Sequence, residues 1–200
     1  AEKAGASGLL VVTPYYNRPP QRGLLAHFRA VADATDLPVC LYDIPGRCGI
    51  PIETDTLIAL AEHPRIVAVK DAKADLFAAT KVMAATDLAW YSGDDVLVLP
   101  HIAQGAVGLI GVTTHLAGQK YAALIDAALA GRRQEAIALN RELIAVADAV
   151  MNTSQGAIMA KAGLVELGVI EHATVRLPLV ESTPEHLEKL RAGLAASGLA

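Results

Sequence analysis

The segment Ile66-Val67-Ala68-Val69-Lys70-Asp71 has the pattern of a buried strand that ends in a lysine. Its first four residues are apolar and mostly β-branched, as is typical of strands inside a sheet. An amine where a strand leaves the core can be partly desolvated, and desolvation lowers the pKa of an amine and makes it a nucleophile toward a carbonyl carbon. A lysine at a strand end is more often simply the first solvated residue, so the rest of the chain must distinguish the two interpretations.

Similar apolar runs recur on both sides of this segment, and each pair is separated by a helical pattern. The other runs predict strands at residues 8–13, 38–42, 88–91 and 107–112. Spacing of 3.6 residues predicts helices at residues 22–34, 54–63, 76–85 and 97–104, and then helices only, at 121–129, 134–150, 157–167 and 184–194. Alternation of strand and helix is typical of a parallel α/β sheet, and uninterrupted apolar strands indicate that both sheet faces are covered.

Two parallel architectures fit this alternation, a doubly wound sheet and a (β/α)8 TIM barrel. No Gly-x-Gly-x-x-Gly motif follows the first predicted strand, so the dinucleotide-binding form has no support. A barrel needs eight strands, and five are visible. We therefore expect the chain to cover strands 4–8, with three preceding units absent from a sequence that starts with Ala1 rather than methionine. Residues 1–130 would be the C-terminal part of the barrel, and residues 131–200 a C-terminal helical region.

The composition excludes several classes of function. The 200 residues are 53% hydrophobic and carry a net charge of −4, so nothing favours binding to nucleic acid or to anionic lipid. No apolar run reaches the roughly 18 residues of a membrane span. Cys40 and Cys48 form neither a disulfide framework nor a zinc motif, which favours the reducing cytoplasm.

The carboxyl ends of parallel strands meet at one edge of a sheet, where α/β proteins bind their ligands. Besides Lys70, Tyr42 ends a predicted strand, and Arg47 lies in the loop that follows it. A desolvated lysine can form a Schiff base with a ketone, a tyrosine hydroxyl can carry the protons, and an arginine fork suits a carboxylate. Strand ends also supply further residues: Tyr15, Tyr16, Ser92, Gly93, Asp94, Asp95, Thr113 and Thr114.

Each of these residues also has an ordinary structural interpretation. A strand-end tyrosine commonly packs with a wet hydroxyl, Arg47 can be a solvated loop charge, and Asp94-Asp95 can cap a helix. The six histidines are scattered, so a metal-dependent aldol mechanism has no support and we expect neither metal nor cofactor.

Four segments, in this order, carry a specific resemblance: Thr13-Pro14-Tyr15-Tyr16-Asn17-Arg18-Pro19, Leu41-Tyr42-Asp43-Ile44-Pro45-Gly46-Arg47, Val69-Lys70-Asp71-Ala72 and Tyr91-Ser92-Gly93-Asp94-Asp95. They resemble the dihydrodipicolinate synthase family, particularly its actinobacterial form, within the pyruvate-dependent class I aldolases. The resemblance implies a cytoplasmic enzyme of lysine and diaminopimelate biosynthesis that condenses pyruvate with L-aspartate 4-semialdehyde to 4-hydroxy-tetrahydrodipicolinate. It also implies a TIM barrel without cofactor and a homotetramer built as a dimer of tight dimers.

The resemblance further implies roles for residues at matching positions. Lys70 forms the Schiff base with pyruvate, and Tyr42 beside it donates and accepts protons. Arg47 binds the carboxylate of the semialdehyde, and Tyr16 is lent across the dimer interface to a proton relay. The pyruvate pocket is lined by Gly93 and Ile110.

One departure from the family leaves alternatives open. The family's Gly-Thr-Thr-Gly-Glu loop, which supplies the relay threonine and holds the carboxylate of pyruvate, has no counterpart in this sequence. A pyruvate-releasing lyase, such as N-acetylneuraminate lyase or a 2-keto-3-deoxy sugar-acid aldolase, would use the same lysine. A third possibility is a non-catalytic fragment that is stable only when paired with another chain.

Overall fold

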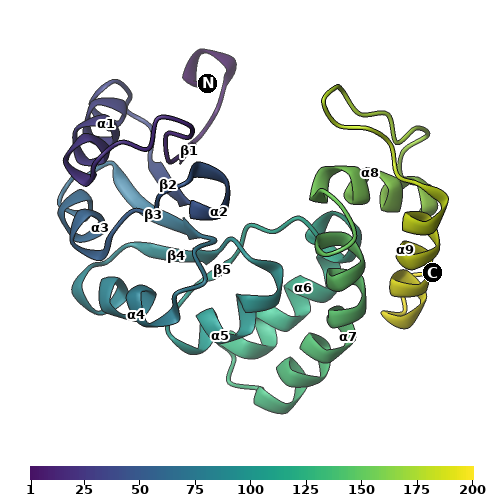
Figure 1. Cartoon of the computed structure of the whole chain (residues 1–200). Coiled ribbons are helices and arrows are strands. Elements are labelled where there is room, and N and C mark those ends of the chain that lie inside the picture. Colours follow the sequence, from purple (N-terminus) through teal and green to yellow (C-terminus); the bar gives the residue numbers. More distant parts are fainter. The chain divides into compact units, whose positions relative to one another are not determined.

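A sheet of five parallel strands lies in the first of two units into which the chain divides, Ala1–Leu109 and Ile110–Ala200. The computed structural model describes residues 1–200. The strands are β1 (Leu9–Val12), β2 (Val39–Asp43), β3 (Ile66–Asp71), β4 (Ala89–Ser92) and β5 (Gly108–Leu109). They are hydrogen-bonded in chain order, and every pair is parallel (Figure 1). The predicted parallel α/β sheet is confirmed, whereas a division at residue 130 stays a prediction.

The helices of the first unit follow the strands in the predicted alternation. They are η1 (Glu2–Ala4), α1 (Gln21–Asp33), α2 (Pro45–Cys48), α3 (Thr54–Ala61), α4 (Leu76–Ala85), η2 (Asp95–Leu97) and α5 (Val98–Ala103). Helices α1, α3 and α4 lie along one side of the sheet (Figure 1). Helix α4 has the predicted bounds, because the side chain of Asp75 caps its first turn by accepting from the backbone N–H of Ala78.

Helix α2 is the one α-helix of this unit that the sequence pattern did not predict. Its string Pro45-Gly46-Arg47-Cys48 resembles a turn. Pro45 lies at the first helical position, where its missing N–H costs nothing, and Gly49 ends the helix at φ +85°. This single turn places Arg47 directly beyond the end of β2.

The two faces of the sheet are covered unequally. Leu41, Val69 and Trp90 are at most 1% exposed on the face that packs against the helices. On β1, by contrast, Leu10 is 49% and Val12 36% exposed. The prediction that both faces are covered is therefore wrong for β1, because Leu10 and Val12 lie on the face opposite to the one that α1, α3 and α4 cover.

The fifth strand is shorter than the predicted run of residues 107–112. It consists of Gly108 and Leu109, and Ile110 belongs to the second unit. The glycines at positions 108 and 111 have no side chain to pack and weaken a strand.

The second unit consists of helices, as predicted. They are α6 (Thr114–Leu129), α7 (Arg133–Met151), α8 (Gly156–Glu166) and α9 (Pro184–Ala196). Helix α6 begins earlier than the predicted residue 121 and is kinked at Ala117. Helix α7 packs against both α6 and α9 around Val146, Val150 and Leu194, all of which are fully buried. No single helix of the chain is long and apolar enough to cross a membrane; α7 and α8 reach that length only as a pair, bent by 116°.

Candidate active site

Lys70 and Tyr42 lie side by side at the carboxyl ends of β3 and β2. They are register partners in the parallel ladder, so their side chains leave the sheet on the same face. The Lys70 Nζ atom lies over the Tyr42 ring, 4.1 Å from its centroid. The structure thus brings together the amine and the hydroxyl-bearing ring that the sequence analysis selected.

The surroundings of this pair favour its reactive protonation states. Burial lowers the pKa of Lys70, against the opposing effect of the nearby Asp95 carboxylate and Cys40. A lowered pKa increases the fraction of unprotonated, nucleophilic amine near neutral pH. Burial also raises the pKa of Tyr42, and the positive charge of Arg47 opposes that shift. Tyr42 therefore keeps its hydroxyl proton and can donate it.

Gly93 allows the ends of β3 and β4 to approach closely. Its N–H donates to the carbonyl oxygen of Asp71 at 2.7 Å. A Cβ atom at this position would lie 3.1 Å from the Asp71 carbonyl and from the Cβ of Ala72, which is tighter than ordinary contacts. A side chain at position 93 would therefore press on the end of β3, next to Lys70.

Two other predicted site residues, Tyr16 and Ile110, lie outside the strands that carry Lys70 and Tyr42. Tyr16 is 95% exposed, with a backbone φ of +70° that a tyrosine rarely adopts. Arg18 in the same loop has a φ of +44°. Two strained residues in one exposed loop indicate a functional role for this loop, because backbone strain of this kind is typical of functional sites. Ile110 opens the second unit, and its part in a pyruvate pocket stays a prediction.

The sequence of the chain matches a known protein family. The sequence profile of the Dihydrodipicolinate synthetase family matches residues 1–197. The chain belongs to this family. It is 54% identical to the 4-hydroxy-tetrahydrodipicolinate synthase of Kineococcus radiotolerans, over 100% of this chain and 65% of that protein. It is 58% identical to the enzyme of that name from Acidothermus cellulolyticus, over 99% of this chain and 64% of the relative.

Solved structures of the dihydrodipicolinate synthetase family show the same fold. A crystal structure of the enzyme from Cyanidioschyzon merolae with lysine bound is 40% identical, with a TM-score of 0.95 over 100% of this chain and 68% of that one. The Aquifex aeolicus enzyme is 36% identical, with a TM-score of 0.94 over 99% and 68% of the two chains. The chain therefore has the predicted TIM-barrel fold and spans about two thirds of the length of these relatives. Its assignment to strands 4–8 stays a prediction.

Two features of this family member were missed by the sequence analysis. The first is Tyr91, the register partner of Lys70 on β4, which therefore leaves the sheet on the same face as the amine. A Cβ atom on Gly108 would lie 3.3 Å from the Tyr91 ring, so the ring packs against the backbone of β5. Strand alternation could have revealed Tyr91, but only with the register of β3 and β4 known.

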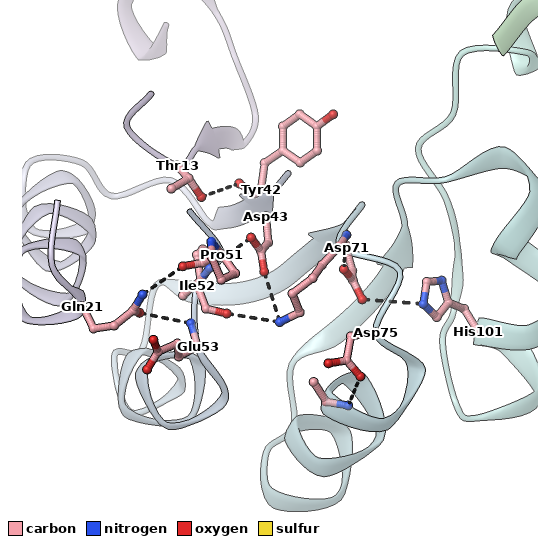
Figure 2. A network of polar contacts seen from close by, with 12 residues as sticks. Thr13, Gln21, Tyr42, Asp43, Pro51, Ile52, Glu53, Asp71, Asp75 and His101 are labelled. Carbon is pink, nitrogen blue, oxygen red and sulfur yellow. Dashed lines mark hydrogen bonds and ion pairs between the residues drawn. The ribbon is translucent and has the colours of Figure 1, made fainter. Parts of the chain in front are cut away.

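The second is a buried carboxyl group directly behind the reactive pair. Figure 2 shows the Tyr42 ring and the Asp43 carboxyl pointing to opposite sides of β2. Asp43 is 1% exposed, and its Oδ1 accepts from the N–H of Ile52 at 3.1 Å. Burial raises the pKa of Asp43 to about 6, although the positive charge of Lys73 nearby opposes the shift.

The raised pKa of Asp43 makes the stability of the protein depend on pH. The folded state binds the Asp43 proton more tightly than the unfolded state, so this group stabilises the fold below about pH 4 and the contribution is lost as pH rises to about 6. Between pH 4.5 and pH 7, Asp43 contributes a fall of about 2 kcal/mol in the free energy of unfolding, and Asp43→Asn should remove this contribution. Urea unfolding at the two pH values measures it. An unchanged drop would contradict the raised pKa.

Proposed function

We propose that the protein carrying this chain condenses pyruvate with L-aspartate 4-semialdehyde to give 4-hydroxy-tetrahydrodipicolinate, in lysine and diaminopimelate biosynthesis. The observation that carries the proposal is the desolvated Lys70 amine over the Tyr42 ring, at the carboxyl end of a parallel sheet. Relatives at 54% and 58% identity are named for this synthase. The proposed enzyme is a class I lyase that needs no metal or cofactor.

The proposed chemistry uses the two groups in turn. The unprotonated Lys70 amine attacks the C2 carbonyl of pyruvate, and the carbinolamine that forms loses water to give a Schiff base. Loss of a C3 proton gives an enamine, which attacks the aldehyde carbon of the semialdehyde. Tyr42 donates the proton that leaves with the hydroxyl and accepts protons in the later steps. Attack of the semialdehyde's amino group on C2 then closes the ring and releases the Lys70 amine.

Arg47 and Tyr16 complete the proposed site. Arg47 lies in α2, which follows the strand of Tyr42, and its positive charge acts on Tyr42; its planar guanidinium fork would bind the carboxylate of the semialdehyde. The exposed, strained Tyr16 would reach the relay of a neighbouring subunit across a tight dimer interface. Gly93 and Ile110 would line the pyruvate pocket. This assignment includes a homotetramer of two tight dimers in the cytoplasm.

Trapping the Schiff base tests the proposal. The protein is incubated with pyruvate, reduced with borohydride, and mapped by mass spectrometry. We expect the mass of a reduced pyruvate adduct on Lys70, and an adduct elsewhere or none at all would overturn the mechanism. A substrate panel then separates the aldolases: turnover of keto-sugar acids without turnover of the semialdehyde would replace the synthase by a lyase. No turnover with any substrate would favour a non-catalytic fragment.

Tyr42→Phe removes the hydroxyl while it keeps the ring under Lys70. We expect turnover to fall about 10²- to 10⁴-fold, because proton transfer by a positioned side chain contributes about that much. The Lys70 adduct should still form, more slowly. Tyr15→Phe is the matched control, since Tyr15 is 66% exposed, and should keep turnover within about twofold. Equal losses in the two variants would contradict the role of Tyr42.

A further inference from the structure

A group of buried titratable side chains lies directly behind the pair of Lys70 and Tyr42. Asp43 follows Tyr42 on β2, and Asp71 follows Lys70 on β3. Successive residues of a strand point to opposite faces, so both carboxyls lie on the helix-covered side of the sheet. Each is 1% exposed. The positions of these carboxyls and of the reactive groups are therefore linked through single peptide units.

Lys73, in the loop after β3, contacts both carboxyl-bearing residues. Its Nζ lies 3.3 Å from Asp43 Oδ2 and donates to the carbonyl oxygen of Ile52 at 3.2 Å. Its backbone N–H donates to Asp71 Oδ1 at 2.8 Å. The Lys73 side chain is 13% exposed, so these contacts are largely shielded from water. One residue thus joins the end of β2 to the end of β3.

The loop around Ile52, whose carbonyl oxygen accepts from Lys73, is itself held in place. The side chain of Gln21, on α1, donates to the carbonyl oxygen of Pro51 at 2.9 Å and accepts from the N–H of Glu53 at 3.1 Å (Figure 2). These two bonds hold the backbone on either side of Ile52. The Lys73 ammonium is therefore fixed between a strand end and a tethered loop.

Ser92, His101 and Asp71 form a second series of buried polar contacts, next to those of Lys73. Ser92 Oγ donates to the carbonyl oxygen of Asp94 at 2.7 Å and lies 2.9 Å from His101 Nδ1, while His101 Nε2 faces Asp71 Oδ2 at 3.6 Å. This order of groups resembles that of a serine hydrolase. Ser92 and His101 are both 0% exposed, however, so no substrate reaches them. Burial lowers the pKa of His101 and raises that of Asp71, which favours a neutral pair.

We propose that Lys73 is a positioning residue, which ties the end of β2 to the end of β3 from behind the sheet and thereby sets the placement of Tyr42 against Lys70. The inference rests on the proposed function. With His101 neutral, Lys73 is the cation that balances Asp43, and without it the two strand ends keep only their backbone bonds, such as Ala72 N–H to Asp43 O at 2.8 Å. A displacement of about 1 Å between reacting groups costs about 10²-fold in rate.

Lys73→Met, which keeps the length of the stem, tests the proposal in the protein that carries this chain. We expect kcat to fall about 10- to 100-fold while KM for pyruvate stays within about threefold, because the amine and its pocket remain. In a crystal structure of the variant, the distance from Lys70 Nζ to the Tyr42 centroid should exceed 4.1 Å. Lys81→Met is the matched control, since Lys81 is an exposed lysine on the neighbouring α4.

A double variant separates positioning from stability. Asp43→Asn with Lys73→Met removes both charges and should recover most of the stability that Lys73→Met loses, because no buried charge remains unpaired. Kcat should stay low in the double variant. Recovery of wild-type kcat there, or unchanged kcat in Lys73→Met, would overturn the proposal. The two proposals fail on different results. If pyruvate does not trap Lys70 in the wild-type protein, the proposed function is wrong. If the distance between Lys70 and Tyr42 is unchanged in the structure of Lys73→Met, the positioning role is wrong.

Discussion

Lys70→Met is expected to abolish the trapped pyruvate adduct and to lower turnover at least about 10³-fold, because no other group can form the Schiff base at this position. Methionine keeps most of the lysine stem, so the packing on Tyr42 remains. Since burial already disfavours the charged amine, an apolar replacement should not destabilise the fold. Steady-state kinetics and mass spectrometry after borohydride reduction measure both effects.

The matched control for Lys70 is Lys81 on α4. Its Nζ also lies over an aromatic ring, 4.7 Å from the centroid of Phe77, but the residue is exposed. Lys81→Met should keep both adduct and turnover, because a solvated ammonium is not activated as a nucleophile. An adduct that survives Lys70→Met would transfer the Schiff base to another lysine and refute the assignment.

Gly193→Ala is expected to lower the free energy of unfolding by about 2–3 kcal/mol, although alanine favours a helix interior by about 1 kcal/mol over glycine. A Cβ atom at Gly193 on α9 would lie 2.6 Å from the Cβ of Ala149 and 2.8 Å from the carbonyl oxygen of Ala145, both on α7. Backbone cannot move aside as a flexible side chain does, so the two helices must separate. Urea unfolding monitored by circular dichroism measures the loss.

Gly118→Ala gives the same substitution in a helix that has room for it. No heavy atom lies within 4 Å of the position of its Cβ. This variant should be stabilised by about 0.5–1 kcal/mol, which is the helix propensity alone. If both glycine variants shift the stability in the same direction, the close approach of α7 and α9 does not control the result.

The regular elements were predictable because their signals are local. The bounds of α4 follow from a 3.6-residue pattern, and β2 and β3 follow from apolar runs. Helix α2 escaped prediction because four residues carry no periodicity and Pro45-Gly46 favours a turn. The extent of β5 was overestimated because an apolar run does not show where strand pairing stops.

The candidate site was predictable in part. The rule that parallel strands present ligands at their carboxyl ends selected Lys70, Tyr42 and Arg47. Tyr91 was missed because its place beside Lys70 depends on the register of β3 and β4. Lys73 was missed because a lysine in a loop is ordinarily solvated, and only the packing of Asp43 behind the sheet gives it a buried partner.

The sequence by itself determined the order of strands and helices and selected Lys70 as the candidate amine, because periodicity and the ends of apolar runs are properties of neighbouring residues. Only the tertiary structure decided that Lys70 lies over Tyr42 and that Lys73 binds Asp43. Both contacts depend on strand register and on desolvation, which arise when residues far apart in the chain exclude water together. The chemistry proposed for Lys70 depends on that exclusion of water.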